Sequence, residues 1–247
     1  MSQITSTANP RLKAAARLRG RRERDRHGLT LIDGVRETMR AMTGGALLRE
    51  VFVVPELLVE PEAKGLLERL AYGDRLDGVV AVAETPLRTL ADLVLPPEPL
   101  ICVVEGVEKP GNLGAVLRTA DGAGVNAVIV AESATDLFNP NIIRASLGTV
   151  FAVPVSVAST GEVLTWLREK SIAILAARVG GSVDYTDADY SGAVAIALGS
   201  EARGLSDAWA ELARASVHVP MLGVADSLNV SATAAVLFYE ALRQRRR

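Results

Sequence analysis

The chain has 247 residues, 49% of them hydrophobic and 23% charged, and its formal net charge is −2. These values are typical of a folded globular protein with two domains or one large α/β domain, and they exclude an intrinsically disordered chain. The sequence contains neither the ~18 consecutive apolar residues of a membrane span nor the apolar core of a signal peptide, so we expect a cytoplasmic protein.

The first 94 residues alternate between helical and strand-like patterns of hydrophobic residues. The expected elements are a basic helix near the N-terminus, a strand and a helix within 29–42, a strand at 49–54, a helix at 61–71 and a strand at 77–84. Three prolines then fall within residues 95–100, which indicates a linker. We therefore predict an α/β domain at 1–94, followed by this linker and a second domain at 101–247.

The predicted N-terminal helix concentrates positive charge. Between residues 11 and 26 the chain has eight basic residues and only two acidic ones. Seven of the eight are arginines, whose planar guanidinium suits phosphate oxygens. Charge alone leaves two interpretations open, a phosphate-binding surface and an ordinary solvated helix.

The second domain repeats strands and helices in alternation. Strands are expected at 100–107, 127–132, 149–156, 172–179, 192–200 and 216–220, with helices at 111–124, 161–171, 205–212 and near the C-terminus. Near-continuous apolar strands that alternate with helices predict a parallel sheet covered by helices on both faces.

Polar residues and glycines follow the first of these strands. Gly111 and Gly114 allow a tight turn, Asn112 is a good helix N-cap, and Arg118 lies on the helix beyond it. The spacing is G-x-x-G rather than the G-x-G-x-x-G of dinucleotide-binding proteins. A capped helix with an exposed arginine would explain this loop equally well.

Two later loops have the same character. Glu201 follows a predicted strand within 197–206, at the strand end where parallel sheets usually bind ligands. Ser227, Asn229 and Ser231 surround the start of the last helix, and one of them would suffice as an N-cap. We therefore expect this last segment to serve both as a cap and as part of a site.

Other chemistries have less support. Cys102 is the single cysteine and lies in an apolar run, which excludes an internal disulfide and predicts a buried thiol. Histidine and cysteine patterns typical of metal sites are absent, as are the nucleophile elbow of hydrolases and the Walker A loop, so we predict no metal. His218 lies in a predicted strand and is expected to be structural.

Taken in order, the three loops resemble the three sequence motifs of the SpoU/TrmH family, the RNA ribose 2′-O-methyltransferases of the SPOUT class. The matching segments are 112–120, 198–205 and 219–235, and the similarity covers residues 100–242. Residues 1–95 resemble, less specifically, the L30e-like RNA-binding domain that many members carry, chiefly in 4–13 and 31–37.

The resemblance implies an L30e-like α/β domain followed by a SPOUT α/β domain with a mostly parallel sheet and a C-terminal trefoil knot. It implies a homodimeric enzyme that uses S-adenosylmethionine, and no metal, to methylate a ribose 2′-hydroxyl in structured RNA. The expected substrate is 23S ribosomal RNA. Transfer RNA as substrate and a non-catalytic RNA-binding protein are the alternatives.

The resemblance also assigns residues by motif position. The catalytic polar positions are matched by Asn112, Arg118, Glu201, Ser227 and Asn229. The cofactor pocket would be formed by Leu198, Gly199, Glu201, Gly204, Val219, Met221, Ser227, Leu228 and Val230. In the basic segment, the residues expected to contact RNA are Arg11, Lys13, Arg17, Arg19, Arg21 and Arg22.

Overall fold

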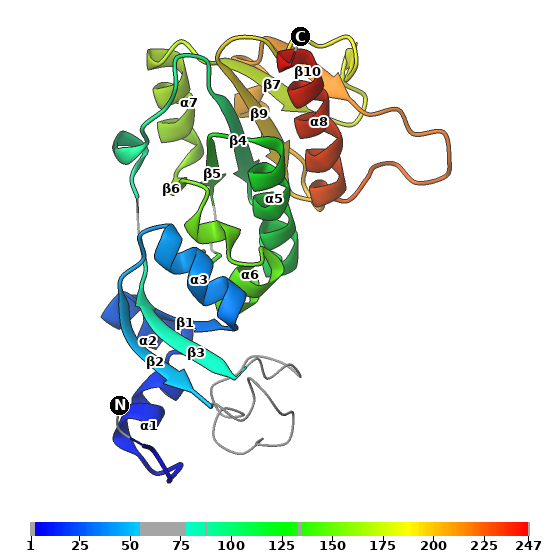
Figure 1. Cartoon of the computed structure of the whole chain (residues 1–247). Coiled ribbons are helices and arrows are strands. Elements are labelled where there is room, and N and C mark those ends of the chain that lie inside the picture. Colours follow the sequence, from blue (N-terminus) through cyan, green and yellow to red (C-terminus); the bar gives the residue numbers. More distant parts are fainter. Residues whose placement is uncertain (1–2, 55–77, 87, 133–134, 247) are drawn as a thin grey trace. The chain divides into compact units, whose positions relative to one another are not determined.

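A computed structural model describes residues 3–54, 78–86, 88–132 and 135–246 (Figure 1). Its internal contacts divide the chain into two compact units. The first unit consists of Met1–Pro86 and Asp136–Ala152, and the second of Leu87–Thr135 and Val153–Arg247. This grouping differs from the predicted domains, because it assigns 136–152 to the N-terminal unit. The helix predicted at 61–71 lies outside the described residues.

The first unit contains an antiparallel sheet with the strand order β1-β3-β2. Its elements are α1 (Pro10–Arg17), α2 (Arg21–His27), β1 (Leu29–Asp33), α3 (Val35–Thr43), β2 (Leu48–Val53), β3 (Val79–Glu84), α6 (Pro140–Ala145) and the 3-10 turn η2 (Thr149–Phe151). The strands predicted in this part of the chain are therefore present. Helix α6 packs against β1, and η2 packs against α3.

The predicted basic helix is two helices rather than one. Helix α1 ends at Arg17, and Gly20 takes an extended conformation as the N-cap of α2, with ψ near 131°. Glycine has a poor helix propensity, which explains a break at this position. On α1, the buried Leu12 and Ala15 pack into a cluster with Leu31, so the basic side chains lie on the opposite, exposed side.

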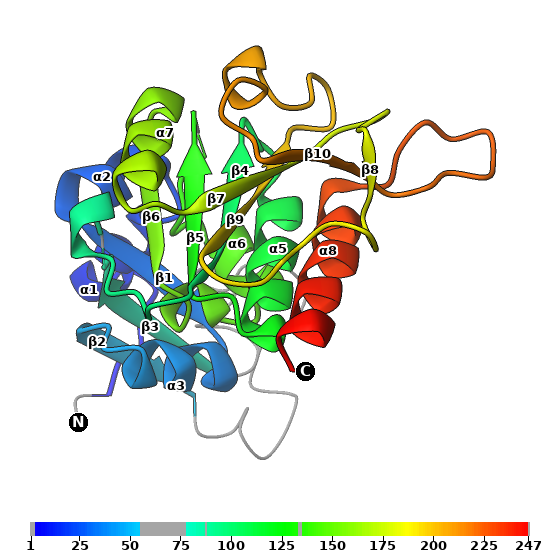
Figure 2. The ribbon, with the colours of Figure 1, turned by 90° about the horizontal axis from the view of Figure 1, so that it is seen from above.

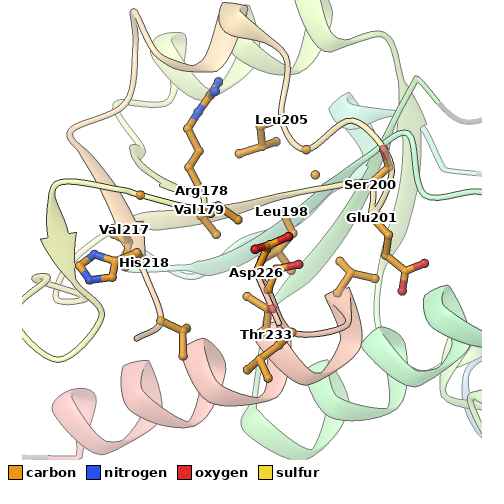
Figure 3. A pocket seen from close by; sticks show the side chains of 18 of the residues that line it. Arg178, Val179, Leu198, Ser200, Glu201, Leu205, Val217, His218, Asp226 and Thr233 are labelled. Atoms are coloured by element: carbon orange, nitrogen blue, oxygen red, sulfur yellow. The ribbon is translucent and has the colours of Figure 1, made fainter. Parts of the chain in front are cut away.

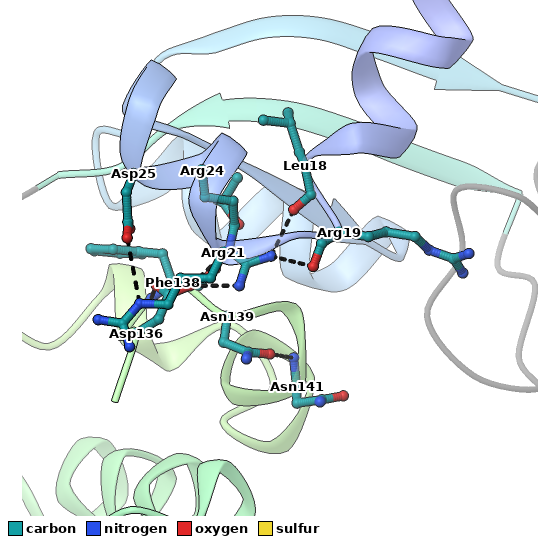
Figure 4. A network of polar contacts seen from close by, with 10 residues as sticks. Leu18, Arg19, Arg21, Arg24, Asp25, Asp136, Phe138, Asn139 and Asn141 are labelled. Carbon is teal, nitrogen blue, oxygen red and sulfur yellow. Dashed lines mark hydrogen bonds and ion pairs between the residues drawn. The ribbon is translucent and has the colours of Figure 1, made fainter. Parts of the chain in front are cut away.

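One arginine of the basic segment is part of the core of this unit. Arg24 is only 4% exposed and pairs with Asp136, its Nη2 lying 2.6 Å from a carboxylate oxygen (Figure 4). Its Nη1 also donates to the backbone carbonyls of Leu18 and Arg19, each at 2.7 Å. Arg24 thus joins the α1–α2 turn to the start of the 136–152 segment.

The second unit is built on a seven-stranded sheet in which every neighbouring pair is parallel (Figure 2). Its strands are β4 (Leu100–Glu105), β5 (Ala127–Ala131), β6 (Val155–Ala158), β7 (Ala173–Ala177), β8 (Val183–Asp184), β9 (Val194–Gly199) and β10 (Ala215–His218). Their order is β6-β5-β4-β9-β7-β10-β8. The predicted α/β class with a mostly parallel sheet is confirmed. The trefoil knot stays a prediction, because strand order does not define how a chain passes through its own loops.

Helices cover both faces of this sheet, as predicted. They are α5 (Pro110–Ala123), α7 (Thr160–Glu169) and α8 (Val230–Arg245), with the 3-10 turns η1 (Leu90–Asp92) and η3 (Asp207–Trp209). Helix α7 packs on one face through Val163, Trp166 and Leu167. Helices α5 and α8 lie side by side and bury Leu117 and Phe238 (Figures 1 and 2). Strands β4, β5 and β9 are buried along nearly their whole length, which explains their continuous apolar sequences.

Several predictions for the second half differ from the structure. The helix predicted at 205–212 is only the 3-10 turn η3, and the last strand is Ala215–His218 rather than 216–220. The strand expected at 149–156 begins only at Val155, after Pro154, because proline has no amide hydrogen to donate to the sheet. The buried Cys102 lies on β4, as expected, and burial raises the pKa of its thiol.

Candidate active site

The three polar loops meet at one edge of the parallel sheet. Strands β4, β9 and β10 end there, and the register pairs Glu105 of β4 with Gly199 of β9. The first loop leads from β4 into α5, the second follows β9, and the third connects β10 to α8. Parallel strands bring their carboxyl ends to the same edge, so residues that are distant in the sequence become neighbours.

Asn112 reaches this site from the first turn of α5. The sequence predicts Asn112 as the N-cap of this helix. The helix begins at Pro110, however, so the N-cap is Lys109. Proline fits the first helical position, where its missing amide hydrogen leaves no bond unmade. The side chain of Asn112 is therefore not used as a cap, and its Nδ2 donates to Glu201 Oε1 at 3.0 Å.

Asn229 does cap a helix, and it also reaches the site. Its Oδ1 accepts hydrogen bonds from the backbone N–H of Ser231 at 2.9 Å and from the Ser231 hydroxyl at 2.6 Å, at the start of α8. Its Nδ2 donates to Glu201 Oε1 at 2.5 Å and to Asn112 Oδ1 at 3.3 Å. One amide side chain thus joins the third loop to the other two.

Glu201 is the common acceptor of this cluster. Besides the two amides, Lys109 Nζ donates to Glu201 Oε2 at 2.9 Å. The hydrogen bond from Lys109 lowers the pKa of Glu201, and Asn112 adds to the effect. The carboxylate is therefore ionised at neutral pH and is a weak base, suited to holding donors in place rather than to accepting a proton.

Lys109 was not among the residues predicted from the sequence. Its position becomes informative only once the helix start at Pro110 is known, because lysine is uncommon at an N-cap, where serine, threonine, aspartate and asparagine are preferred. A positive charge at a helix N-terminus is also unfavourable beside the helix dipole. The carboxylate of Glu201 compensates for this charge.

Two predicted catalytic residues do not join the cluster. Arg118 is exposed on α5, and Ser227 is exposed in the loop before α8. Within the described parts of the chain, neither side chain forms a hydrogen bond or an ion pair in this structure. Asn112, Glu201 and Asn229 are thus the predicted catalytic residues that the fold brings into contact.

A cavity of about 490 Å³ opens beside this cluster (Figure 3). All nine residues predicted to form the cofactor pocket line it, namely Leu198, Gly199, Glu201, Gly204, Val219, Met221, Ser227, Leu228 and Val230. Its wall also contains residues that the sequence analysis did not select, including Arg178 and Gly180 after β7, His218 and Asp226. Glycines at 180 and 181 directly after a strand were the available signal.

Gly199 allows the second loop to fold back onto the end of β9. A Cβ atom at this position would lie 2.0 Å from the carbonyl carbon of Gly204 and 2.2 Å from the nitrogen of Leu205. No side chain fits there. Gly204 itself has a φ of +66°, a left-handed conformation that favours glycine. These two glycines are therefore required by the shape of the cavity wall.

A second cavity, of about 800 Å³, shares part of this wall. It extends along the β4–α5 loop and is lined by Lys109 and Asn112 among others. The residues common to both cavities are Ser200, Glu201, Arg203, Gly204 and Val230. Glu201, the common acceptor of the polar cluster, therefore lies at the boundary between two spaces, and a group held in one cavity would be adjacent to a group held in the other.

None of the helices described is long and apolar enough to span a bilayer. The described residues also contain no group of three or more histidine, cysteine, aspartate or glutamate side chains arranged to hold a metal ion.

A parallel sheet between helices, with polar loops around a cavity at the carboxyl ends of its strands, defines an α/β protein that binds a small ligand at that edge. Residues 99–239 match the SpoU rRNA Methylase family, and residues 9–99 match the MRM3-like substrate binding domain. The chain belongs to the SpoU rRNA methylase family.

Similar proteins match over nearly the whole chain. The 23S rRNA (guanosine(2553)-2′-O)-methyltransferase RlmP of Bacillus subtilis is 28% identical, over 97% of this chain and 98% of its own. A crystal structure of an RNA 2′-O ribose methyltransferase is 44% identical, covers 99% of both chains and has a TM-score of 0.87. The SpoU methyltransferase AviRb from Streptomyces viridochromogenes, crystallised with the cofactor AdoMet, is 31% identical with a TM-score of 0.86 over 96% of this chain and 98% of its own.

Proposed function

We propose that this chain is an enzyme that transfers a methyl group from S-adenosylmethionine to a ribose 2′-hydroxyl of structured RNA, with 23S ribosomal RNA as the substrate. The observation that carries the proposal is the cluster of Asn112, Glu201 and Asn229, in which Glu201 lines both cavities and Asn112 lines the second. A wall shared by two cavities suits the transfer of a small group between a cofactor on one side and an acceptor on the other. Membership of the SpoU family and the full-length match to a 23S ribosomal RNA enzyme support it.

The first cavity fits S-adenosylmethionine. Its volume of about 490 Å³ falls in the range usual for small-molecule pockets. Leu198, Val219, Leu228 and Val230 offer apolar side chains for an adenine ring, and the backbone at Gly199 can approach a ligand closely because no side chain intervenes. When bound, the cofactor supplies an electrophilic methyl group on its sulfonium. A positively charged sulfonium is also compatible with the ionised Glu201 in the same wall.

The polar cluster would act by positioning the acceptor. Alignment of two reactants can lower a barrier by up to about 7 to 11 kcal/mol in favourable intramolecular cases. We assign the orientation of the ribose to Asn112, Ser227 and Asn229, and the orientation of the two amides to Glu201. The low pKa of Glu201 argues against its use as the general base.

Arg118 is assigned to the ribose or its phosphate, where it would stabilise negative charge developing on the 2′-oxygen. A guanidinium is always protonated and cannot accept the proton. The test is turnover of Arg118→Ala and Arg118→Lys with saturating RNA. We expect both variants to lose turnover. Alanine removes the positive charge, and lysine keeps the charge but lacks the planar fork of the guanidinium. Near-normal turnover in both would remove Arg118 from the reaction.

The N-terminal part of the chain is assigned to RNA binding. Arg11, Lys13, Arg17, Arg19, Arg21 and Arg22 are all exposed on α1, α2 and the turn between them. Within this part of the chain, Arg11 also forms an ion pair with Glu50, and Arg21 forms one with Asp25. RNA affinity should fall steeply with salt, because cations bound to the phosphates are released on binding.

The deciding assay compares substrates directly. The purified protein is incubated with methyl-labelled S-adenosylmethionine and either ribosomal or transfer RNA from a deletion strain, and 2′-O-methyl positions are then mapped. Methylation of 23S ribosomal RNA supports the proposal, and methylation of transfer RNA alone identifies the alternative substrate. A protein that binds RNA but shows no cofactor binding by calorimetry would be the non-catalytic alternative.

Further properties belong to the same proposal. We assign residues 1–94 to an L30e-like substrate-binding domain, 95–100 to a linker and 101–247 to a SPOUT catalytic domain with a trefoil knot. We also assign the chain to a homodimer in the cytoplasm. Analytical ultracentrifugation over a range of concentrations would test the dimer, and a monomer at all concentrations would contradict it.

A further inference from the structure

Strand β9 is flanked by β4 on one side and β7 on the other. At the carboxyl edge of the sheet, Glu105 is the last residue of β4 and pairs in register with Gly199. On the other side Ala177, the last residue of β7, pairs with Leu198, so Arg178 is the first residue beyond that strand. Glu105 and Arg178 thus stand on either side of the point where the second loop leaves the sheet.

Ser206 lies at the end of that loop and is held from both sides. Its backbone N–H donates to Glu105 Oε2 at 2.7 Å, and its hydroxyl donates to Glu105 Oε1 at 2.9 Å. Its carbonyl oxygen accepts a hydrogen bond from Arg178 Nη2. All three polar groups of this residue are therefore bound by side chains from the two strands that flank β9.

Glu105 is buried and fully engaged. Its Oε1 also accepts from the hydroxyl of Thr160, at the start of α7, at 2.6 Å. Burial raises the pKa of the Glu105 carboxyl, but the N–H of Ser206 and the two hydroxyls more than offset this and leave the pKa below its ordinary value. A buried carboxylate with three donors is held rigidly, and so are its donors.

The segment between the two anchors is the cavity wall. Gly199 to Leu205 all line the first cavity except Ala202, and the loop is closed internally by the N–H of Gly204, which donates to the carbonyl of Ser200 at 2.8 Å. Figure 3 shows Arg178 extending beside Leu205 in this wall. Glu105, in contrast, lines the second cavity but not the first. It can affect a ligand in the first cavity only through the loop.

We infer that Glu105 is a positioning residue for cofactor binding, which, with Arg178, holds the 199–206 loop in its binding shape through Ser206. The inference rests on the proposed function, because the ligand of the first cavity is taken to be S-adenosylmethionine. Without the anchor at Glu105, the N–H and hydroxyl of Ser206 lose their acceptor, and the loop no longer has a single position over Gly199. Cofactor affinity then falls because part of the binding energy orders the loop.

Two variants of Glu105 separate geometry from charge. Glu105→Met removes both acceptor oxygens at similar side-chain length. Glu105→Gln can keep one oxygen toward the Ser206 N–H and donate from its amide to the two hydroxyls, because a hydroxyl also accepts hydrogen bonds. Glu169→Met, at an exposed glutamate on α7, is the matched control.

The experiment measures cofactor affinity by calorimetry, together with kcat, the KM for S-adenosylmethionine and the Kd for RNA. In Glu105→Met we expect the Kd and KM for the cofactor to rise about 10- to 100-fold, the loss typical of a hydrogen bond to a charged group. We expect kcat at saturating cofactor and RNA affinity to change far less than cofactor affinity, which a general loss of folding would not produce. Glu105→Gln and Glu169→Met should both remain close to wild type.

Wild-type cofactor affinity in a folded Glu105→Met, or a Glu105→Gln as weak as Glu105→Met, would overturn the inference. If Glu105→Met does not fold, Arg178→Met tests the second anchor, and wild-type cofactor affinity in that variant would overturn it too. If the unaltered protein binds no S-adenosylmethionine, the proposed function is wrong and the inference falls with it. Binding by the wild type and equally by the variants would refute the inference alone.

Discussion

Asn229 donates a hydrogen bond to Glu201 across 28 residues of sequence, while the oxygen of the same amide caps helix α8. The two bonds use opposite ends of one side chain. The orientation of the amide is thereby determined, because the end that caps the helix must be the oxygen and the end that meets the carboxylate must be the nitrogen. Asn229 thus links the stability of a helix to the geometry of the candidate site.

The two roles of Asn229 can be separated by substitution. Serine is as good an N-cap as asparagine but has no amide to offer Glu201. We expect Asn229→Ser to unfold like the wild type in urea and to lose methyl transfer by about tenfold or more. Asn229→Ala should lose activity as well and should also lose roughly 1 kcal/mol of unfolding free energy. An active Asn229→Ser would show that the amide serves only as a cap.

Lys109 should control the titration of Glu201. Because the lysine lowers the pKa of this carboxyl, replacing it by methionine should move the titration of Glu201 to higher pH. A carboxyl with a lowered pKa in the folded state stabilises the fold above its unfolded pKa, and this contribution disappears as pH falls through the folded pKa. The stability difference between Lys109→Met and wild type should therefore be present at neutral pH and vanish in acid.

NMR titration of carbon-13-labelled glutamate side chains, together with urea unfolding at several pH values, measures both effects. Lys170→Met, at an exposed lysine after α7, is the control and should leave Glu201 unchanged. An unshifted Glu201 in Lys109→Met would mean that the ion pair is not maintained in solution.

Gly199 should not tolerate alanine. The added Cβ would lie 2.0 Å from a backbone carbon of Gly204, so the loop must move away from the strand end. We expect Gly199→Ala to lose cofactor affinity measured by calorimetry and to melt at a lower temperature. Gly161→Ala is the matched control, because a Cβ there meets nothing within 4 Å on the first turn of α7. That control should be neutral or more stable by up to about 1 kcal/mol.

Arg24 and Arg22 are neighbours on α2 with different predicted effects. Arg24 is buried and paired with Asp136, so Arg24→Met leaves a carboxylate without its partner and should cost roughly 3 to 5 kcal/mol of unfolding free energy. Arg22 is exposed. Arg22→Met should therefore leave stability unchanged and weaken RNA binding. It should also reduce the slope of log affinity against log salt concentration by about one.

Thermal unfolding and RNA titrations at two or more salt concentrations check this pair together. The assignment of RNA binding to the basic segment would be wrong if Arg22→Met, combined with charge removal at Arg19 and Arg21, left both the affinity and its salt dependence unchanged.

Much of the fold could be predicted from local patterns. The apolar runs of β4, β5 and β9 identify strands covered on both faces, and the Asn229 cap that begins α8 is visible in the sequence. The division of α1 from α2 at Gly20 was missed, although glycine was the available signal. The placement of 136–152 in the N-terminal unit was also missed, because it depends on partners more than a hundred residues away, such as Arg24 for Asp136.

Local sequence patterns determined which residues stand at strand ends and helix starts. These positions identified Asn112, Glu201 and Asn229 as candidate site residues. Only the tertiary structure decided their contacts with one another, with Lys109 at one side of Glu201. It alone also connected Glu105 and Arg178 through Ser206. The reason is physical. Propensity and hydrophobic period act over a few neighbouring residues, whereas a hydrogen bond between loops exists only after the parallel sheet has aligned its strand ends.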